Sequence, residues 1–392
     1  MDVSRFDAHS PGDLAPIVGH DTYLDRPYKH FAFVPRPLEE FPTLEPSTFG
    51  ILAKADAAVA RLDGLTTRLP DPMILVRPTL LREAISTSAL EGTYAAARNV
   101  LAADLTPEES RSQAEREILN VARATYLAIR LIQQKPICMT VLNELQQAIV
   151  AGTRSDGPQA GRLRTSQVYI GKQRDGIEKS RFVPAPPGET LIAGYDLWEK
   201  WINSGVELPI TLGVALGHYQ FETLHPYHDG NGRLGRLVMM LQFLESGALK
   251  YPVLNLSPWL DDRKDEYRDG LLNVSVTGDF DTWVRFIAQC VIEQSAEAAD
   301  QIGKLVDYRD DLLRRLHAAK ARGVILRLAA DIVGRPIMSP SQVAKEYGVT
   351  YPPASKAIAQ LVKMGVLVEI TGQQYGRLYE CEAVYRILGF DN

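Results

Sequence analysis

The feature that most constrains the fold is a turn of glycine and polar residues that runs directly into an apolar helix. Gly230-Asn231-Gly232 forms the turn, and LVMMLQFLE follows shortly after it, before Gly247 closes the helix. The start of a helix exposes backbone N–H groups and the positive end of the helix dipole, and glycines let an anion approach them closely. This segment therefore predicts a helix whose N-terminus binds an anion, and phosphate suits such a site.

Ionisable side chains surround this turn in an order that suits attack on a phosphate. Arg233 and Arg236 are three residues apart, so they share one helix face and can reach the same polyanion. Asp229 precedes the turn and can hold Mg²⁺ beside the phosphates. His225 and His228 both titrate near neutral pH, and either could take a proton from an attacking hydroxyl. Their spacing alone does not choose between them.

Two other interpretations fit this segment less well. A plain tight turn would not require His, Asp and two Arg residues together. A zinc site at His225, His228 and Asp229 lacks the i, i+4 helical spacing of a metalloprotease, and no fourth ligand is evident. The Gly-Lys-Ser/Thr of a Walker loop is missing from the segment, which excludes a P-loop ATPase.

The twelve residues from His225 to Arg236, HPYHDGNGRLGR, closely resemble the Fic family motif HPFx(D/E)GNGRxxR, and only Tyr227 departs from it, replacing Phe. The resemblance implies a protein adenylyltransferase that moves AMP from ATP, with Mg²⁺, onto a Tyr, Thr or Ser hydroxyl of a target protein and that modifies itself. It also implies that His225 is the general base and Asp229 the Mg²⁺ ligand. The phosphate contacts that it implies are Gly230, Asn231 and Gly232 at the α- and β-phosphates, Arg233 at the β-phosphate and Arg236 at the γ-phosphate, together with the intervening Leu234 and Gly235. It also implies that Tyr267 lies near the adenine, although packing of this ring in the core is an equally good interpretation.

A second resemblance concerns regulation. Thr87 to Gly92, TSALEG, resembles the Fic inhibitory motif (S/T)xxxE(G/N). It implies that Thr87 and Glu91 belong to an inhibitory helix, where Glu91 would pair with Arg236 and displace the γ-phosphate. Taken alone, the six residues would indicate only a surface helix. Glu91 could also orient a hydrolytic water, which leaves removal of AMP as an alternative activity.

The stretch from Thr165 to Val183 places β-formers on both sides of a charged, glycine-containing turn and predicts a β-hairpin. It occupies the position of the Fic flap, which docks the target by pairing with its backbone. A purely structural hairpin is the alternative. The residues that would form the docking edge are Gln167, Val168, Tyr169, Ile170 and Gly171.

The other predicted elements are mostly helical. The first forty-odd residues, rich in Pro, Asp and aromatics, predict an extended arm. Ser47 or Thr48 could cap the first helix, and Pro78 would open a second that continues to Glu91. Further helices are expected from Pro107 to about Gln134 and after Pro136.

The last seventy residues predict a winged helix-turn-helix. Ser339 could cap a helix that Gly348 ends, Thr350 to Met364 forms a second helix, and two short strands follow. DNA binding, as in a transcription regulator, is the rival function, and the same module could serve in a homodimer. The cations on the recognition helix and wing are few, so we expect any DNA contact to weaken quickly with salt; the candidates are Lys356, Gln360, Lys363 and Arg377.

We therefore expect a mainly α fold, the Fic helical bundle with a β-hairpin flap plus a C-terminal winged helix-turn-helix. The predicted domains are an N-terminal arm and helical region with the inhibitory motif (1–115), a Fic catalytic core (116–300), and a linker helix with the winged helix (301–392). A net charge of −5 argues against a chain that coats nucleic acid. The sequence has three widely spaced cysteines and lacks a signal peptide or membrane span, so we expect a cytoplasmic protein without a membrane partner.

Overall fold

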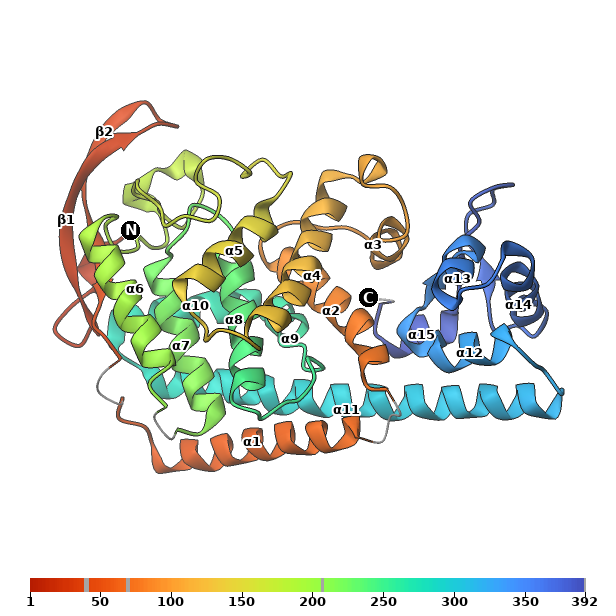
Figure 1. Cartoon of the computed structure of the whole chain (residues 1–392). Coiled ribbons are helices and arrows are strands. Elements are labelled where there is room, and N and C mark those ends of the chain that lie inside the picture. The colour runs from red at the N-terminus through yellow and green to blue at the C-terminus, as the bar shows by residue number, and fades with distance from the viewer. Residues whose placement is uncertain (39–41, 68–70, 206–207, 391–392) are drawn as a thin grey trace. The chain divides into compact units, whose positions relative to one another are not determined.

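The computed structural model describes residues 1–38, 42–67, 71–205 and 208–390 (Figure 1). The chain is mostly helical and forms two compact units, neither of which is continuous in sequence. Unit 1 comprises Met1–Val59, Arg123–Ala248 and Trp259–Ile292. Unit 2 comprises Ala60–Ala122, Leu249–Pro258 and Glu293–Asn392.

Two buried helices form the centre of unit 1. Nearly every residue of α7 (Ile210–Leu224) and all but the last two of α8 (Asn231–Glu245) are inaccessible to solvent, including several polar and charged side chains. Gly235 allows their close approach, because a Cβ at this position would overlap Oε1 of Glu222 on α7. The surrounding helices are α5 (Met139–Val150), α6 (Glu189–Ile202), α9 (Ser257–Asp262) and α10 (Lys264–Thr277).

The N-terminal residues form a β-hairpin, so the prediction of an extended arm was wrong. Strand β1 (Gly12–Asp21) pairs antiparallel with β2 (Arg26–Pro35), in a register from Gly12 opposite Pro35 to Asp21 opposite Arg26. The turn closes because Asp21 Oδ1 accepts the N–H groups of Tyr23 and Leu24, at 3.0 and 3.1 Å. A short helix, η1 (Val3–Arg5), precedes the hairpin. Residues 39–41 of the predicted arm lie outside the described residues.

The segment 165–183 folds back on itself as predicted, and an antiparallel β-bridge joins its two arms. Its β-bridge pairs Ile170 with Phe182, and η3 (Gln173–Asp175) and η4 (Ile177–Lys179) lie between them. The charged run folds into these tight turns, as predicted. Phe33 of β2 donates its N–H to the Val183 carbonyl at 2.8 Å, and the apolar side chains of the two segments share one small core.

Two predicted helix starts were also wrong. Helix α1 (Pro46–Thr66) begins before Ser47, and the Thr48 hydroxyl donates to Asp281 at 2.6 Å instead of capping the helix. Helix α2 (Met73–Leu90) begins five residues before Pro78, because Asp71 Oδ1 accepts the Met73 N–H. Pro78 lies inside the helix and has no N–H to donate to the Ile74 carbonyl, and a Cβ at Gly334 would overlap that carbonyl.

Unit 2 ends in a small helical module with a three-stranded sheet of order β3-β5-β4. The Ser339 hydroxyl caps α13, and a left-handed Gly348 ends it. Arg98 makes two hydrogen bonds of 2.7 Å with the buried Glu380 of β5, which ties α3 to this sheet. Identification as a winged helix-turn-helix stays a prediction, as does DNA contact. The elements of this unit are α3 (Ala97–Ala103), η2 (Glu108–Ser110), α4 (Gln113–Leu131, shared with unit 1), α11 (Phe280–Ala318, shared with unit 1), α12 (Val324–Asp331), η5 (Ile332–Gly334), β3 (Ile337–Met338), α13 (Pro340–Tyr347), α14 (Tyr351–Lys363), β4 (Val368–Glu369), β5 (Tyr379–Glu380) and α15 (Glu382–Ile387).

None of the helices in the described part of the chain is long and apolar enough to cross a membrane.

Candidate active site

The site is the loop between α7 and α8 in unit 1. His225 ends α7 in the left-handed conformation, with φ 49° and ψ 61°, and its N–H donates to the Phe221 carbonyl at 3.0 Å. This conformation is unfavourable for a residue with a Cβ. It turns the chain sharply, so that the imidazole stands at the entrance of the loop and stays partly exposed. Something in the surrounding structure must stabilise it.

A buried arginine holds this turn from behind. Arg164 is 1% exposed. Its Nε donates to the His225 carbonyl at 2.8 Å, and its Nη2 donates to the carbonyls of Leu224, at 3.3 Å, and Ala185. The Arg164 backbone N–H donates to the Pro226 carbonyl at 2.9 Å. Three successive carbonyls of the loop are thus bound by one residue from the segment before the flap.

Asn231 closes the loop from the other end. Its Oδ1 accepts the Tyr227 N–H at 2.8 Å, and its Nδ2 donates to the Tyr227 carbonyl at 2.7 Å. The Tyr227 ring is fully buried, and its hydroxyl donates to Asn143 of α5 at 2.9 Å. The tyrosine therefore occupies the core position expected of the aromatic residue here and gains a polar anchor. These two hydrogen bonds between the Asn231 side chain and the Tyr227 backbone restrict the conformation of the loop.

The N-terminus of α8 has no side-chain cap, although its residues are buried. Gly230 precedes it in the left-handed conformation, with φ 81°, and no side chain caps the helix. The first N–H groups of a helix have no partner within the helix, so they can bind an anion. Gln146 of α5 fixes the approach: its Nε2 donates to the Asp229 carbonyl at 3.0 Å, and its Oε1 accepts the Gly161 N–H.

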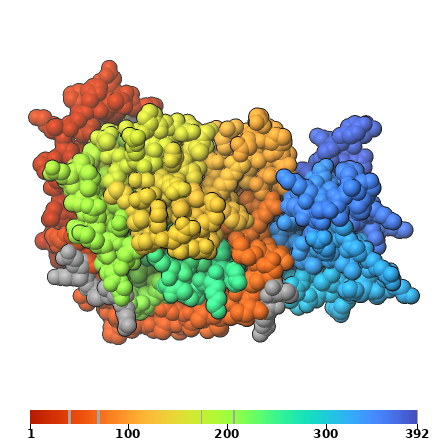
Figure 2. All heavy atoms as spheres, viewed as in Figure 1, coloured from red at the N-terminus to blue at the C-terminus, as the bar shows by residue number. Residues whose placement is uncertain are grey.

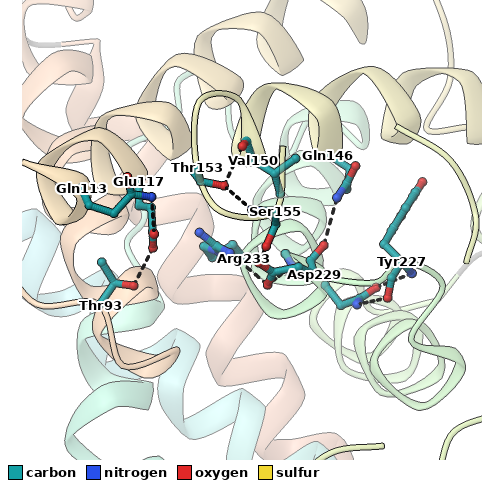
Figure 3. A network of polar contacts seen from close by, with 12 residues as sticks. Thr93, Gln113, Glu117, Gln146, Val150, Thr153, Ser155, Tyr227, Asp229 and Arg233 are labelled. Atoms are coloured by element: carbon teal, nitrogen blue, oxygen red, sulfur yellow. Dashed lines mark hydrogen bonds and ion pairs between the residues drawn. The ribbon is translucent and has the colours of Figure 1, made fainter. Parts of the chain in front are cut away.

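Asp229 is held in its charged form by its neighbours (Figure 3). Its Oδ1 accepts from Gly230 N at 2.7 Å and lies 3.2 Å from Nη2 of Arg233, and its Oδ2 accepts the Ser155 hydroxyl. Burial acts to raise the pKa of this carboxyl, but Arg233, the two hydrogen bonds and Arg154 outweigh it, so the pKa lies below its usual value. The carboxylate remains about a third exposed, at 37%, and can therefore still reach a cation.

The two arginines of α8 are largely withdrawn from solvent. Arg233 is 5% and Arg236 3% exposed, so their charges act in a region of low dielectric constant. His228, by contrast, is exposed, and burial of part of its ring together with the charge of Arg164 lowers its pKa. The structure thus places His225 in the turn that Arg164 binds, whereas His228 is exposed to solvent.

The remaining predicted nucleotide contacts lie in the core. Leu234 is fully buried, and Gly235 faces α7. Tyr267 of α10 is 4% exposed, and its hydroxyl is 2.8 Å from Nε2 of His218, within an aromatic cluster that includes Trp283. In this structure, Tyr267 packs in the core against His218 of α7.

The predicted docking segment lies at the surface of unit 1. The side chains of Gln167 to Ile170 are half-buried, and Gln167 Nε2 donates to the carbonyls of Val168 and Pro184, at 2.9 and 2.8 Å. The chain that follows α5 and leads to this segment is largely exposed, and it is part of the yellow surface in Figure 2.

The predicted inhibitory residues belong to unit 2. Thr87 is 2% exposed, and Glu91 is the exposed C-cap of α2, followed by a left-handed Gly92.

Sequence reasoning missed the residues that support the loop from other elements: Asn143, Gln146, Ser155 and Arg164. Nothing in the local pattern separates Arg164 from the exposed Arg162. Their role depends on contacts with residues between 61 and 84 positions away, which a local pattern does not encode.

Comparison with known proteins identifies the core of the chain. Residues 50–130 match the Fic/DOC family N-terminal model, and residues 136–243 match the Fic/DOC family model. The chain carries a Fic domain. The loop between α7 and α8 lies within it, as does the flap segment.

Relatives and solved structures agree with this Fic domain. The chain is 30% identical over 201 residues to the protein adenylyltransferase Fic of Drosophila virilis, covering 50% of this chain and 38% of the relative. It is 27% identical over 247 residues to the Drosophila melanogaster protein of the same name, covering 60% of this chain and 46% of the relative. The chain therefore spans less than half the length of these curated relatives.

Among solved structures, a Fic family protein from Desulfovibrio desulfuricans matches with a TM-score of 0.58 at 18% identity, covering 86% of this chain and 97% of that one. A Fic-domain signalling protein from Bacteroides thetaiotaomicron matches with a TM-score of 0.50 at 19% identity, covering 64% of this chain and 97% of that one. The predicted mainly α Fic fold is thus confirmed.

Proposed function

We propose that this chain is a protein adenylyltransferase that transfers AMP from Mg·ATP to a Tyr, Thr or Ser hydroxyl of a target protein. One observation carries the proposal: a rigid loop presents the His225 imidazole directly before an uncapped helix N-terminus that bears the buried Arg233 and Arg236. The Drosophila relatives, which are named protein adenylyltransferases, support the same class of reaction.

The residues present fit ATP and Mg²⁺. The α8 N-terminus and two buried arginines supply donors and positive charge for a polyphosphate. Within the described ranges, no group of three or more His, Cys, Asp or Glu side chains could hold a metal by itself. Mg²⁺ is often held by one or two carboxylates together with substrate phosphates. Asp229, ionised and partly exposed, would hold an ion that arrives with the nucleotide.

The proposed chemistry is an in-line displacement at the α-phosphorus. His225 accepts the proton of the target hydroxyl, whose oxygen forms a bond to the α-phosphorus while the bond to the departing pyrophosphate breaks. Arg233, Arg236 and the first N–H groups of α8 stabilise the negative charge of the phosphates. Residues 167–171 would hold the target backbone beside the loop.

Regulation is a separate part of the proposal. The resemblance of residues 87–92 to the inhibitory motif supports a brake at Glu91, so Glu91→Gly should transfer AMP faster than the wild-type chain. Removal of AMP is the alternative activity. It predicts release of AMP from a modified target that depends on Glu91, which the same variant would abolish.

Intact-mass spectrometry tests the reaction directly. The wild-type chain and Glu91→Gly, incubated with Mg·ATP and a target or with themselves, should gain the mass of one AMP per modified site. His225→Ala should gain none while still binding ATP, and His228→Ala is the matched control that should keep most of the activity. Equal modification by His225→Ala would remove His225 from the role of base, and no gain in any variant would refute the transfer.

A further inference from the structure

The burial of Arg164 is costly and no ion pair offsets the cost. Its side chain is 1% exposed, and none of the ion pairs found among the described residues includes it. Burial lowers its pKa to about 10, which reflects the loss of hydration of the charged guanidinium. An apolar side chain of similar size would fill this space without that penalty. The hydrogen bonds that Arg164 makes must therefore be what the structure gains.

Those hydrogen bonds converge on the turn that carries the imidazole. The guanidinium donates to the carbonyls of Leu224 and His225, which are the last residue of α7 and its left-handed cap. Of the other acceptors, Ser166 lies at the start of the flap segment and Ala185 follows its end. A planar group with five donors in a fixed arrangement can hold all four carbonyls in one geometry, which an ammonium group cannot do.

On the basis of the proposed function, we propose that Arg164 is a positioning residue for AMP transfer, which fixes the left-handed backbone of His225 and so aims its imidazole at the hydroxyl. A left-handed residue other than glycine is disfavoured, and it persists only where its surroundings hold it. Without the guanidinium, the carbonyls of Leu224 and His225 lose their donor, and the backbone at His225 can relax to an ordinary conformation. The imidazole then moves away from its place at the loop entrance.

The phosphate-binding half of the loop is held independently. Asn231 binds both backbone groups of Tyr227, and Gln146 binds the Asp229 carbonyl. Loss of Arg164 should therefore impair the chemical step much more than the binding of ATP. A residue with a merely structural role would lower stability without separating kcat from KM.

The test compares Arg164→Lys and Arg164→Met in the full chain, in whichever of the wild-type and Glu91→Gly backgrounds transfers AMP faster. Since a displacement of 1 Å can cost about 100-fold in rate, we expect kcat to fall about 100-fold in Arg164→Met and about 10-fold in Arg164→Lys. The KM for ATP should change by less than about threefold in both. If Arg164→Met does not fold, Arg164→Lys alone decides, because its ammonium can reach only part of the acceptor set.

Trp198→Phe is the matched control for lost stability. It removes one buried hydrogen bond in the same unit, from Nε1 to the Gly217 carbonyl at 2.9 Å, and does not touch the loop. Its kcat should stay within about twofold of the parent. The inference is overturned if the Arg164 variants match this control in kcat at a similar melting temperature, or if KM rises while kcat is unchanged. Absence of transfer in the parent protein would instead refute the proposed function.

Discussion

His218 offers the sharpest quantitative test of the packing around the site. The ring lies in α7, is fully buried, and packs against both Tyr267 and Trp283, with centroid distances of 5.9 and 6.3 Å. Burial, and next the positive charge of Arg236, lower its pKa from 6.5 to about 3, against the effect of a backbone hydrogen bond with Gly235. The imidazole of the folded protein should therefore stay neutral well above pH 3.

The stability consequence follows from proton linkage. Between pH 6.5 and about 3 the unfolded chain binds a proton at His218 that the folded chain does not, so stability rises with pH in this window and is fully present above it. Each pH unit is worth about 1.4 kcal/mol. From pH 8 down to pH 5 the contribution of His218 should thus fall by about 2 kcal/mol.

Two measurements check this value. Urea unfolding of the wild type and of His218→Gln, followed by tryptophan fluorescence from pH 5 to 8, should show that the stability difference between them shifts by about 2 kcal/mol in favour of the variant at pH 5. NMR of histidine-labelled protein, with the His218 signal assigned by the same variant, should show no titration from pH 5 to 8. A native His218 signal that titrates near pH 6.5 would refute the argument.

Two further predictions concern the backbone of the loop and the α7–α8 contact. Asn231→Ala removes both hydrogen bonds to the Tyr227 backbone and leaves buried groups unpaired, so the free energy of unfolding should fall by about 2–4 kcal/mol, and AMP transfer should fall too. Urea unfolding measures the change in stability. A free energy of unfolding within about 0.5 kcal/mol of the wild type, which is roughly the effect of a surface substitution, would contradict the prediction. Gly235→Ala puts a methyl group against Glu222 and 3.1 Å from the Phe221 ring, so it should destabilise by about 1–3 kcal/mol. Its control is Gly213→Ala on the same helix pair, where a Cβ meets nothing within 4 Å and the melting temperature should not fall.

Local sequence pattern was sufficient where one short segment decides the outcome. The glycine turn, the apolar helix after it and its end near Gly247 all follow from residues close together in the chain, and so do the Ser339 cap and the left-handed Gly348. The sequence also predicted His225 and Asp229 just before the helix and Arg233 on it, and Asp229 and Arg233 do form a contact. Their chemical roles are proposals that this arrangement supports.

Local sequence pattern did not predict the structure where contacts with residues far away in the chain decide how the backbone folds. Residues 12–35 have the Pro and Asp content of an arm, yet they pair as a hairpin because Asp21 closes the turn and Phe33 finds a core with residues 177–183. The segment 165–183 does fold back as its composition predicts, with one bridge between Ile170 and Phe182, but only the structure shows that it packs in this same core.

The sequence by itself determined that an uncapped, glycine-rich helix start would follow a histidine and an aspartate, because helix, turn and charge order are encoded within about twelve residues. Only the tertiary structure decided how that loop is made rigid. Arg164, Gln146 and Asn143 reach it from other elements, and the buried carbonyls of a left-handed turn must find donors wherever packing brings them. That choice depends on the whole core, so no short stretch of sequence records it.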